Sequence, residues 1–176
     1  MKHIATVALM LHLGVAGVYA QQRPVKMTFS GSNVATTINL QPNTITDEQI
    51  VAGNGTLGPF TFRELHADTT TPQSSSSCSG PYFLVVAGGG VFRFQDGSLL
   101  TVRITEGNGC INLAVGQARL TVTYQITGGT GRFKNASGNL TYTATMVPIF
   151  FNGSSPAMLT LTGEIEGTVI GDASEE

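Results

Sequence analysis

The chain has 176 residues, with 22 glycines, 41% hydrophobic residues and 11% charged residues. This length favours a single domain, and the apolar content excludes a disordered, highly charged chain. Nine basic against eleven acidic residues give a net charge of −2, so the sequence has no basic field that could hold nucleic acid.

The first residues have the layout of a secretory signal peptide. Lys2 precedes a mostly apolar run over residues 4–18, and the run ends in a small-residue cleavage pattern. A membrane anchor is the alternative, but the run is shorter than the roughly 20 residues of a spanning helix. We therefore expect a signal peptide at 1–20, cleavage after Ala20, and a mature domain at 21–176 with a frayed C-terminal tail. Such a protein is secreted or periplasmic and has no stable membrane span.

Two cysteines, Cys78 and Cys110, belong to the expected mature chain. In an exported protein an even number of cysteines indicates a disulfide, and closing a loop of about 30 residues contributes on the order of 3–4 kcal/mol. A zinc site is the alternative, but these residues form no Cys-x-x-Cys pair, and His66 alone cannot complete four ligands with them. The sequence predicts a Cys78–Cys110 disulfide, no metal and no cofactor.

Alternation of apolar and polar residues, and not a helical period, dominates the mature chain. It predicts strands at residues 25–29, 33–40, 60–67, 82–87, 91–95, 99–106, 118–126, 140–149 and 158–170. Glycine-rich breaks are expected between strands at 53–55, 88–90, 107–109 and 128–129. Residues 69–80, rich in Ser and Thr, are expected to form a long loop tied down by Cys78.

Eight or nine strands, each with one apolar face, suit a closed antiparallel barrel because closure removes exposed strand edges. A barrel of about eight strands is filled by side chains or holds one small ligand. A β-sandwich is the structural alternative. An outer-membrane barrel is disfavoured because most of these strands are shorter than the ~9–11 residues that cross a bilayer. We expect an all-β chain that forms a single closed antiparallel barrel of about eight strands.

Residues 125–138 carry a motif that supports this fold. The sequence Gly-Gly-Thr-Gly-Arg-Phe at 128–133, together with Gly138, resembles the segment that joins two strands in the allene oxide cyclase and dirigent barrels. The glycines permit a tight turn, and Phe133 can tuck under the barrel end before a strand resumes near Leu140. The resemblance implies a calycin-like barrel, in those families often dimeric or trimeric, whose mouth holds an apolar molecule. The catalytic positions of these families do not align with this chain residue by residue.

Three titratable residues, Glu64, His66 and Asp68, occupy alternate positions, so a regular strand places them on one face. If that face lines the barrel, Glu64 and His66 are candidates for a general acid/base pair, since burial and a neighbouring carboxylate shift pKa values. The simpler interpretation is that the strand ends here and that these side chains point to water.

Aromatic residues on the apolar faces are candidate ligand contacts: Phe60, Phe62, Tyr124 and Tyr142. The sequence is compatible with three functions. The first expectation is a binding protein that holds a small apolar or amphipathic ligand in the barrel. The alternatives are a cyclase- or isomerase-type enzyme resembling allene oxide cyclase, with Glu64 and His66 as its acid and base, and a structural or interaction protein without a pocket. A homo-oligomer is compatible with each of them.

Overall fold

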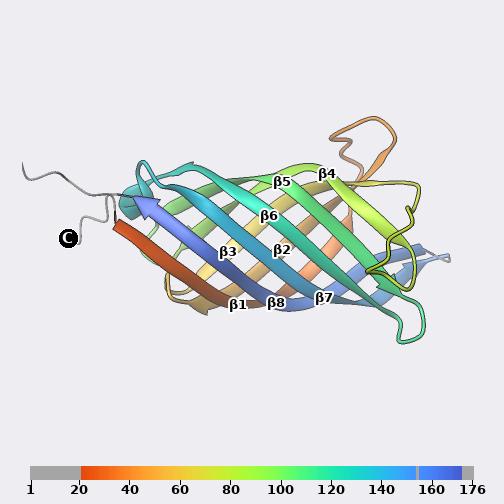
Figure 1. Ribbon diagram of the computed structural model, residues 1–176. Helices are drawn as coiled ribbons and strands as arrows, with labels where there is room; N and C mark the ends of the chain where they lie inside the picture. Colours follow the sequence, from red (N-terminus) through yellow and green to blue (C-terminus); the bar gives the residue numbers. More distant parts are fainter. Residues whose placement is uncertain (1–20, 154, 172–176) are drawn as a thin grey trace, which may run out of the picture.

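A computed structural model describes residues 21–153 and 155–171, which form a closed antiparallel barrel (Figure 1). Each strand pairs with the next one along the chain, and β8 returns to pair with β1. The strands are β1 (Gln21–Ala35), β2 (Thr44–Gly55), β3 (Phe60–Thr69), β4 (Tyr82–Phe94), β5 (Leu99–Asn112), β6 (Gln117–Gly129), β7 (Ser137–Asn152) and β8 (Ser155–Gly171). The expected closed barrel is confirmed, whereas the expected signal peptide and C-terminal tail lie outside the described residues.

The connections divide the barrel into two ends. The turn end carries the short connections 56–59 and 95–98, the segment 130–136, and the pair formed by Gln21 and Gly171. The loop end, on the right in Figure 1, carries the other connections, including the two longest, residues 36–43 and 70–81. Within the described residues, no helix has the length and hydrophobicity that crossing a membrane requires.

Several expected breaks turn out to be strand. Residues 88–90 join the expected strands 82–87 and 91–95 into the single strand β4, and residues 107–109 lie inside β5. Residues 53–55 and 128–129 end β2 and β6. The expectation of breaks at these glycine-rich segments is therefore wrong for most of their residues. Several of these glycines lie within a strand, where the missing side chain leaves room for the side chain of a neighbouring residue.

The expected strand at 33–40 is also wrong at its end. It forms one strand with residues 25–29, but this strand, β1, stops at Ala35. The chain then turns back, and Thr36 donates a backbone hydrogen bond to the carbonyl of Thr46. The returning strand β2 was not expected, since Asp47, Glu48 and Gln49 interrupt its apolar alternation.

In the half of the barrel next to the turn end, aromatic rings fill the interior and pack against glycines of the neighbouring strands. A Cβ added to Gly90 would lie 2.6 Å from Cε2 of Phe62, and one added to Gly163 would lie 2.6 Å from Cζ of Phe29. The rings stack on one another, with centroids 4.0 Å apart for Phe62 and Phe92. We call this region the closed half, because its inward side chains are buried and contact one another closely.

The motif at 128–133 closes the turn end. Residues Gly131–Phe133 form a short 3₁₀ helix, and the buried ring of Phe133 lies with its centroid 4.7 Å from that of Phe94, as expected. The guanidinium of Arg132 lies over both rings and forms an ion pair of 3.1 Å with Asp96. The glycine-rich segment therefore caps the aromatic interior.

The predicted disulfide is confirmed. Cys78 of the long loop is bonded to Cys110 of β5, with 5.7 Å between their Cα atoms. The bond attaches the loop between β3 and β4 to strand β5 at the loop end. It links two positions that are 32 residues apart in the sequence.

Adding a methyl group at Gly90 tests the packing of the closed half. Gly90→Ala places a Cβ against the Phe62 ring and within 2.6 Å of the Arg63 carbonyl oxygen, so we expect the free energy of unfolding to fall by about 1–3 kcal/mol. Gly109→Ala is the matched control, because a Cβ there meets no heavy atom within 4 Å. Urea unfolding followed by circular dichroism measures both, and equal stability of the two variants would contradict the tight packing at Gly90.

Candidate functional site

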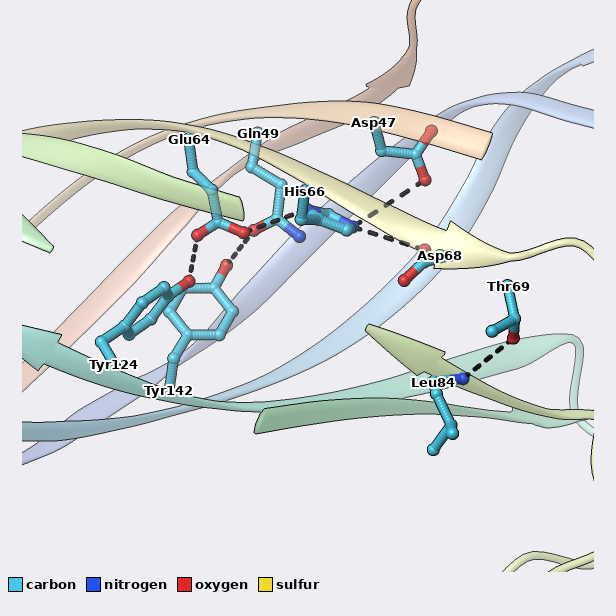
Figure 2. A network of polar contacts seen from close by, with 9 residues as sticks. All are labelled: Asp47, Gln49, Glu64, His66, Asp68, Thr69, Leu84, Tyr124 and Tyr142. Atoms are coloured by element: carbon cyan, nitrogen blue, oxygen red, sulfur yellow. Dashed lines mark hydrogen bonds and ion pairs between the residues drawn. The ribbon is translucent and has the colours of Figure 1, made fainter. Parts of the chain in front are cut away.

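Polar side chains gather in the interior of the barrel around Glu64 and His66 (Figure 2). Asn33, Gln49 and Glu64 lie opposite one another across β1, β2 and β3, and in the next row toward the loop end Asp47 lies opposite His66. Side chains of directly paired residues share one face of the sheet, which here is the inner face. We call the following set the polar cluster: Asn33, Asp47, Gln49, Glu64, His66 and Asp68, with the hydroxyl groups of Tyr124 and Tyr142.

Glu64 and His66 form an ion pair at the centre of this cluster. Nδ1 of His66 lies 3.0 Å from Oε1 of Glu64, although the two groups are not aligned for a good hydrogen bond. The hydroxyl of Tyr124 donates a hydrogen bond to the other carboxylate oxygen, Oε2. The glutamate is therefore held between a phenol from β6 and an imidazole from its own strand.

A second tyrosine hydroxyl makes a similar hydrogen bond beside the Glu64–His66 pair. The hydroxyl of Tyr142 donates a hydrogen bond of 2.7 Å to Oε1 of Gln49. The Tyr142 ring stacks on Phe29 and meets the Tyr124 ring edge to face, so both tyrosines present their rings to the closed half and their hydroxyls to the polar cluster. These two residues form the boundary between apolar and polar interior.

Two carboxylates face the other nitrogen of His66. Nε2 lies 3.5 Å from Oδ2 of Asp68 and 4.0 Å from Oδ2 of Asp47. The His66 side chain is 2% exposed, whereas those of Asp47 and Asp68 are 18% and 23% exposed. The two aspartates therefore connect the buried imidazole with the solvent at the loop end (Figure 2).

These surroundings determine the protonation of the cluster. Burial opposes the charged form of His66, but the contacts and charges of Asp68 and Glu64 outweigh it and raise its pKa to about 10. Burial also raises the pKa of Asp47. Burial and the nearby Glu64 carboxylate raise the pKa values of both tyrosines well above their usual value, so the tyrosines act as neutral hydrogen-bond donors.

The structure contradicts the simpler interpretation of residues 64–68. Glu64 and His66 are 1% and 2% exposed and face the interior, because β3 continues to Thr69 instead of ending before them. Their proposed role as an acid/base pair stays a prediction. Sequence alternation missed Asp47 and Gln49 because it missed β2. The β-branched residues Ile45, Ile50 and Val51 were the remaining signal for a strand there.

The four aromatic candidates lie in or beside the closed half. Phe60 and Phe62 contact the ring of Phe92, and Tyr124 and Tyr142 contact each other and Phe62. None of the four is more than 4% exposed. Their expected role as ligand contacts stays a prediction, and the interior as it stands surrounds them with protein.

The fold and the cluster define an up-and-down eight-stranded barrel with charged side chains buried halfway along its axis. No family model matches the chain, and no curated protein matches it. Among solved structures, that of a pterocarpan synthase dirigent protein is similar over 91% of this chain and 90% of the other, with a TM-score of 0.47 and 12% identity. This similarity carries no inference about family, ligand or reaction.

The protonation of His66 can be measured directly. Because its pKa is raised from 6.5 to about 10, we expect the ¹⁵N shifts of its ring at pH 8 to be those of an imidazolium. The protein is first treated with a chelator, so that no metal ion occupies the ring nitrogens. This ionisation stabilises the fold in full below pH 6.5, and the contribution is lost as the pH rises through about 10.

A pair of variants provides the control for this titration. Glu64→Gln removes the carboxylate beside Nδ1 and should move the titration of His66 to lower pH. Glu164→Gln, on the outer face of β8, should leave it unchanged. A His66 that titrates near pH 6.5 in the unaltered protein would contradict the arrangement described here.

Proposed function

We propose that the protein binds a small amphipathic molecule inside the loop end of the barrel. The observation that carries this proposal is the open space beside Gly109. This residue pairs with Phe83 and with the buried Leu120, so a side chain at position 109 would point into the barrel. A Cβ at Gly109 would have no heavy atom within 4 Å, whereas one at the inward Gly90 would strike the Phe62 ring.

Apolar residues occupy inward positions in the rows near Gly109 and toward the loop end. Ile111 shares an inward row with Ala118 and Met146, and Leu159 lies opposite the buried Asn33. Unlike the rings of the closed half, Phe83, Ile111, Met146 and Leu159 are only partly buried. Covering such surface is favourable by roughly 25 cal/mol per Å², so the loop end gains free energy from an apolar occupant.

The polar cluster supplies the other half of an amphipathic site. Asp47 and Asp68 lie at the inner boundary of the loop end and are reached by solvent. A hydroxyl or amino group on an otherwise apolar molecule could donate hydrogen bonds to these carboxylates. Ligand sites are commonly of this kind, with mostly apolar walls and a few placed polar groups.

The contacts of Glu64 favour binding over catalysis. Its Oε2 accepts from Tyr124 and its Oε1 lies against His66, so both oxygens already have protein neighbours. A cyclase- or isomerase-type activity would require a substrate to reach this pair past Asp47 and Asp68. The packed closed half alone would suit a structural protein without a pocket, but the space beside Gly109 argues against that alternative.

The same proposal includes export. The Cys78–Cys110 disulfide supports an oxidising compartment, since such bonds are rare in reducing ones. The composition of residues 1–20 supports a signal peptide. Appearance of a mature chain beginning at Gln21 in the medium or periplasm of an expressing cell is the result that this proposal expects.

Binding can be tested with 1-octanol, a neutral amphiphile, by NMR of methyl groups. We expect saturable shifts at the methyl groups of Met146 and Leu159 and none at those of Met27 and Leu140, which are fully buried in the closed half. Shifts confined to the exposed Leu113 in the loop would show surface adsorption and contradict the proposal.

A space-filling variant makes this test specific. Gly109→Leu should occupy the open space and weaken octanol binding at least tenfold without lowering the free energy of unfolding. Thr28→Leu, which adds the same side chain to the outer face of β1, is the matched control and should bind like the unaltered protein. Equal binding by both variants would place the ligand elsewhere.

A further inference from the structure

Three side chains at the inner boundary of the loop end have the arrangement of metal ligands. Donor atoms of Asp47, His66 and Asp68 all lie within 4.8 Å of one another, and Nε2 of His66 lies 3.5 Å and 4.0 Å from the two carboxylates. Ligands bound to a tetrahedral ion at about 2.0–2.2 Å lie about 3.3–3.6 Å apart. Small side-chain rotations would therefore bring all three onto one ion.

The contact on the other side of the imidazole is the one that metal-binding histidines use. Such histidines direct their second ring nitrogen to a carboxylate, which fixes the tautomer and makes the ligand nitrogen more basic. Here Oε1 of Glu64 lies 3.0 Å from Nδ1, which leaves Nε2 facing Asp47 and Asp68. Tyr124 holds Glu64 in turn, so the chain from β6 to Nε2 is already in place (Figure 2).

Asn33 adds an observation that does not depend on the acidic residues. Its side chain is 2% exposed, and its amide interacts with the carboxylate of Asp47. Its Oδ1 has no hydrogen-bond partner within the described part of the chain, although a buried amide oxygen normally has one. The amide N–H of Asn33 can thus fix the orientation of Asp47, and its unpartnered Oδ1 is a further oxygen ligand available in the polar cluster.

The charges of the cluster favour a cation. His66 is in contact with three carboxylates, those of Asp47, Glu64 and Asp68. One positive charge on the imidazole cannot balance all three when they are ionised, and excess negative charge in a partly buried site is costly. A divalent cation that replaces the proton on Nε2 adds one positive charge and satisfies the carboxylates facing it.

We propose that Asp47, His66 and Asp68 bind a divalent transition-metal ion of the zinc type, with Glu64 as the carboxylate that orients His66. Imidazole nitrogen selects such ions over magnesium and calcium. Because Asp47 and Asp68 are partly exposed, the remaining coordination position faces the loop end, where water or a polar group of a ligand can occupy it. The proposal does not depend on binding of an amphipathic molecule.

Zinc alone is the probe for this site. The full chain, freed of metal with a chelator, is titrated with Zn²⁺ by calorimetry, and we expect one ion per chain with micromolar or tighter affinity. Asp47→Asn and Asp68→Asn should each weaken zinc binding at least tenfold, while Glu164→Gln on the outer face of β8 should not change it. These substitutions keep the size of the side chain and a hydrogen-bonding oxygen, so they preserve the fold.

A spectroscopic measurement separates this site from the other imidazoles. The full chain also contains His3 and His12, which could take up zinc independently. Binding at the proposed site moves the ¹⁵N shift of Nε2 of His66 to that of a metal-bound nitrogen, and Glu64→Gln weakens binding roughly 10–100-fold. The proposal is overturned if zinc is not bound saturably, if binding survives in both aspartate variants, or if the His66 shifts do not respond.

Discussion

The contact between Glu64 and His66 governs the middle of the barrel. An unpaired charge in a protein interior costs several kcal/mol, and removing one member of a buried pair typically costs about 3–5 kcal/mol, so each of these residues makes the burial of the other less costly. Their positions two apart on β3 put both on the inner face, and the Tyr124 hydroxyl satisfies the oxygen that His66 does not reach. The remaining polar residues of the interior are arranged around this pair.

This charged layer separates two kinds of interior. On one side, rings and glycines fit together so closely that a methyl group at Gly90 has no room; on the other, the space beside Gly109 is open. A sheet closed by eight strands encloses a volume that side chains can just fill. The chain fills it where the strands carry stacked Phe and Tyr rings, whereas at the loop end inward side chains such as Ile111 and Met146 are only partly buried. The same barrel thus has a tightly packed half next to the turn end and a more open interior at the loop end.

Alternation in the sequence was sufficient to predict most strands, since Leu120 to Ile126 and Leu140 to Met146 face the interior at every second position. It failed where the interior departs from simple hydrophobic filling. The strand β2 was missed because its inward positions include Asp47 and Gln49, which belong to the polar cluster. Gly88–Gly90 suggested a break because local sequence does not reveal that a Phe62 ring lies against the inner face there. Burial of Glu64 likewise depends on Tyr124 of β6, which is 60 residues away along the chain.

The order of strands also has a consequence for how the chain folds. Every ladder but one joins strands that follow each other in the chain, whereas the β1–β8 ladder pairs Gln21 with Gly171. Consecutive hairpins form quickly, but contacts between residues far apart in the chain form slowly. Until β8 reaches β1, two long strand edges and the aromatic rings face water, and such surfaces promote aggregation. Formation of the β1–β8 ladder thus converts an exposed, association-prone sheet into a closed barrel without strand edges.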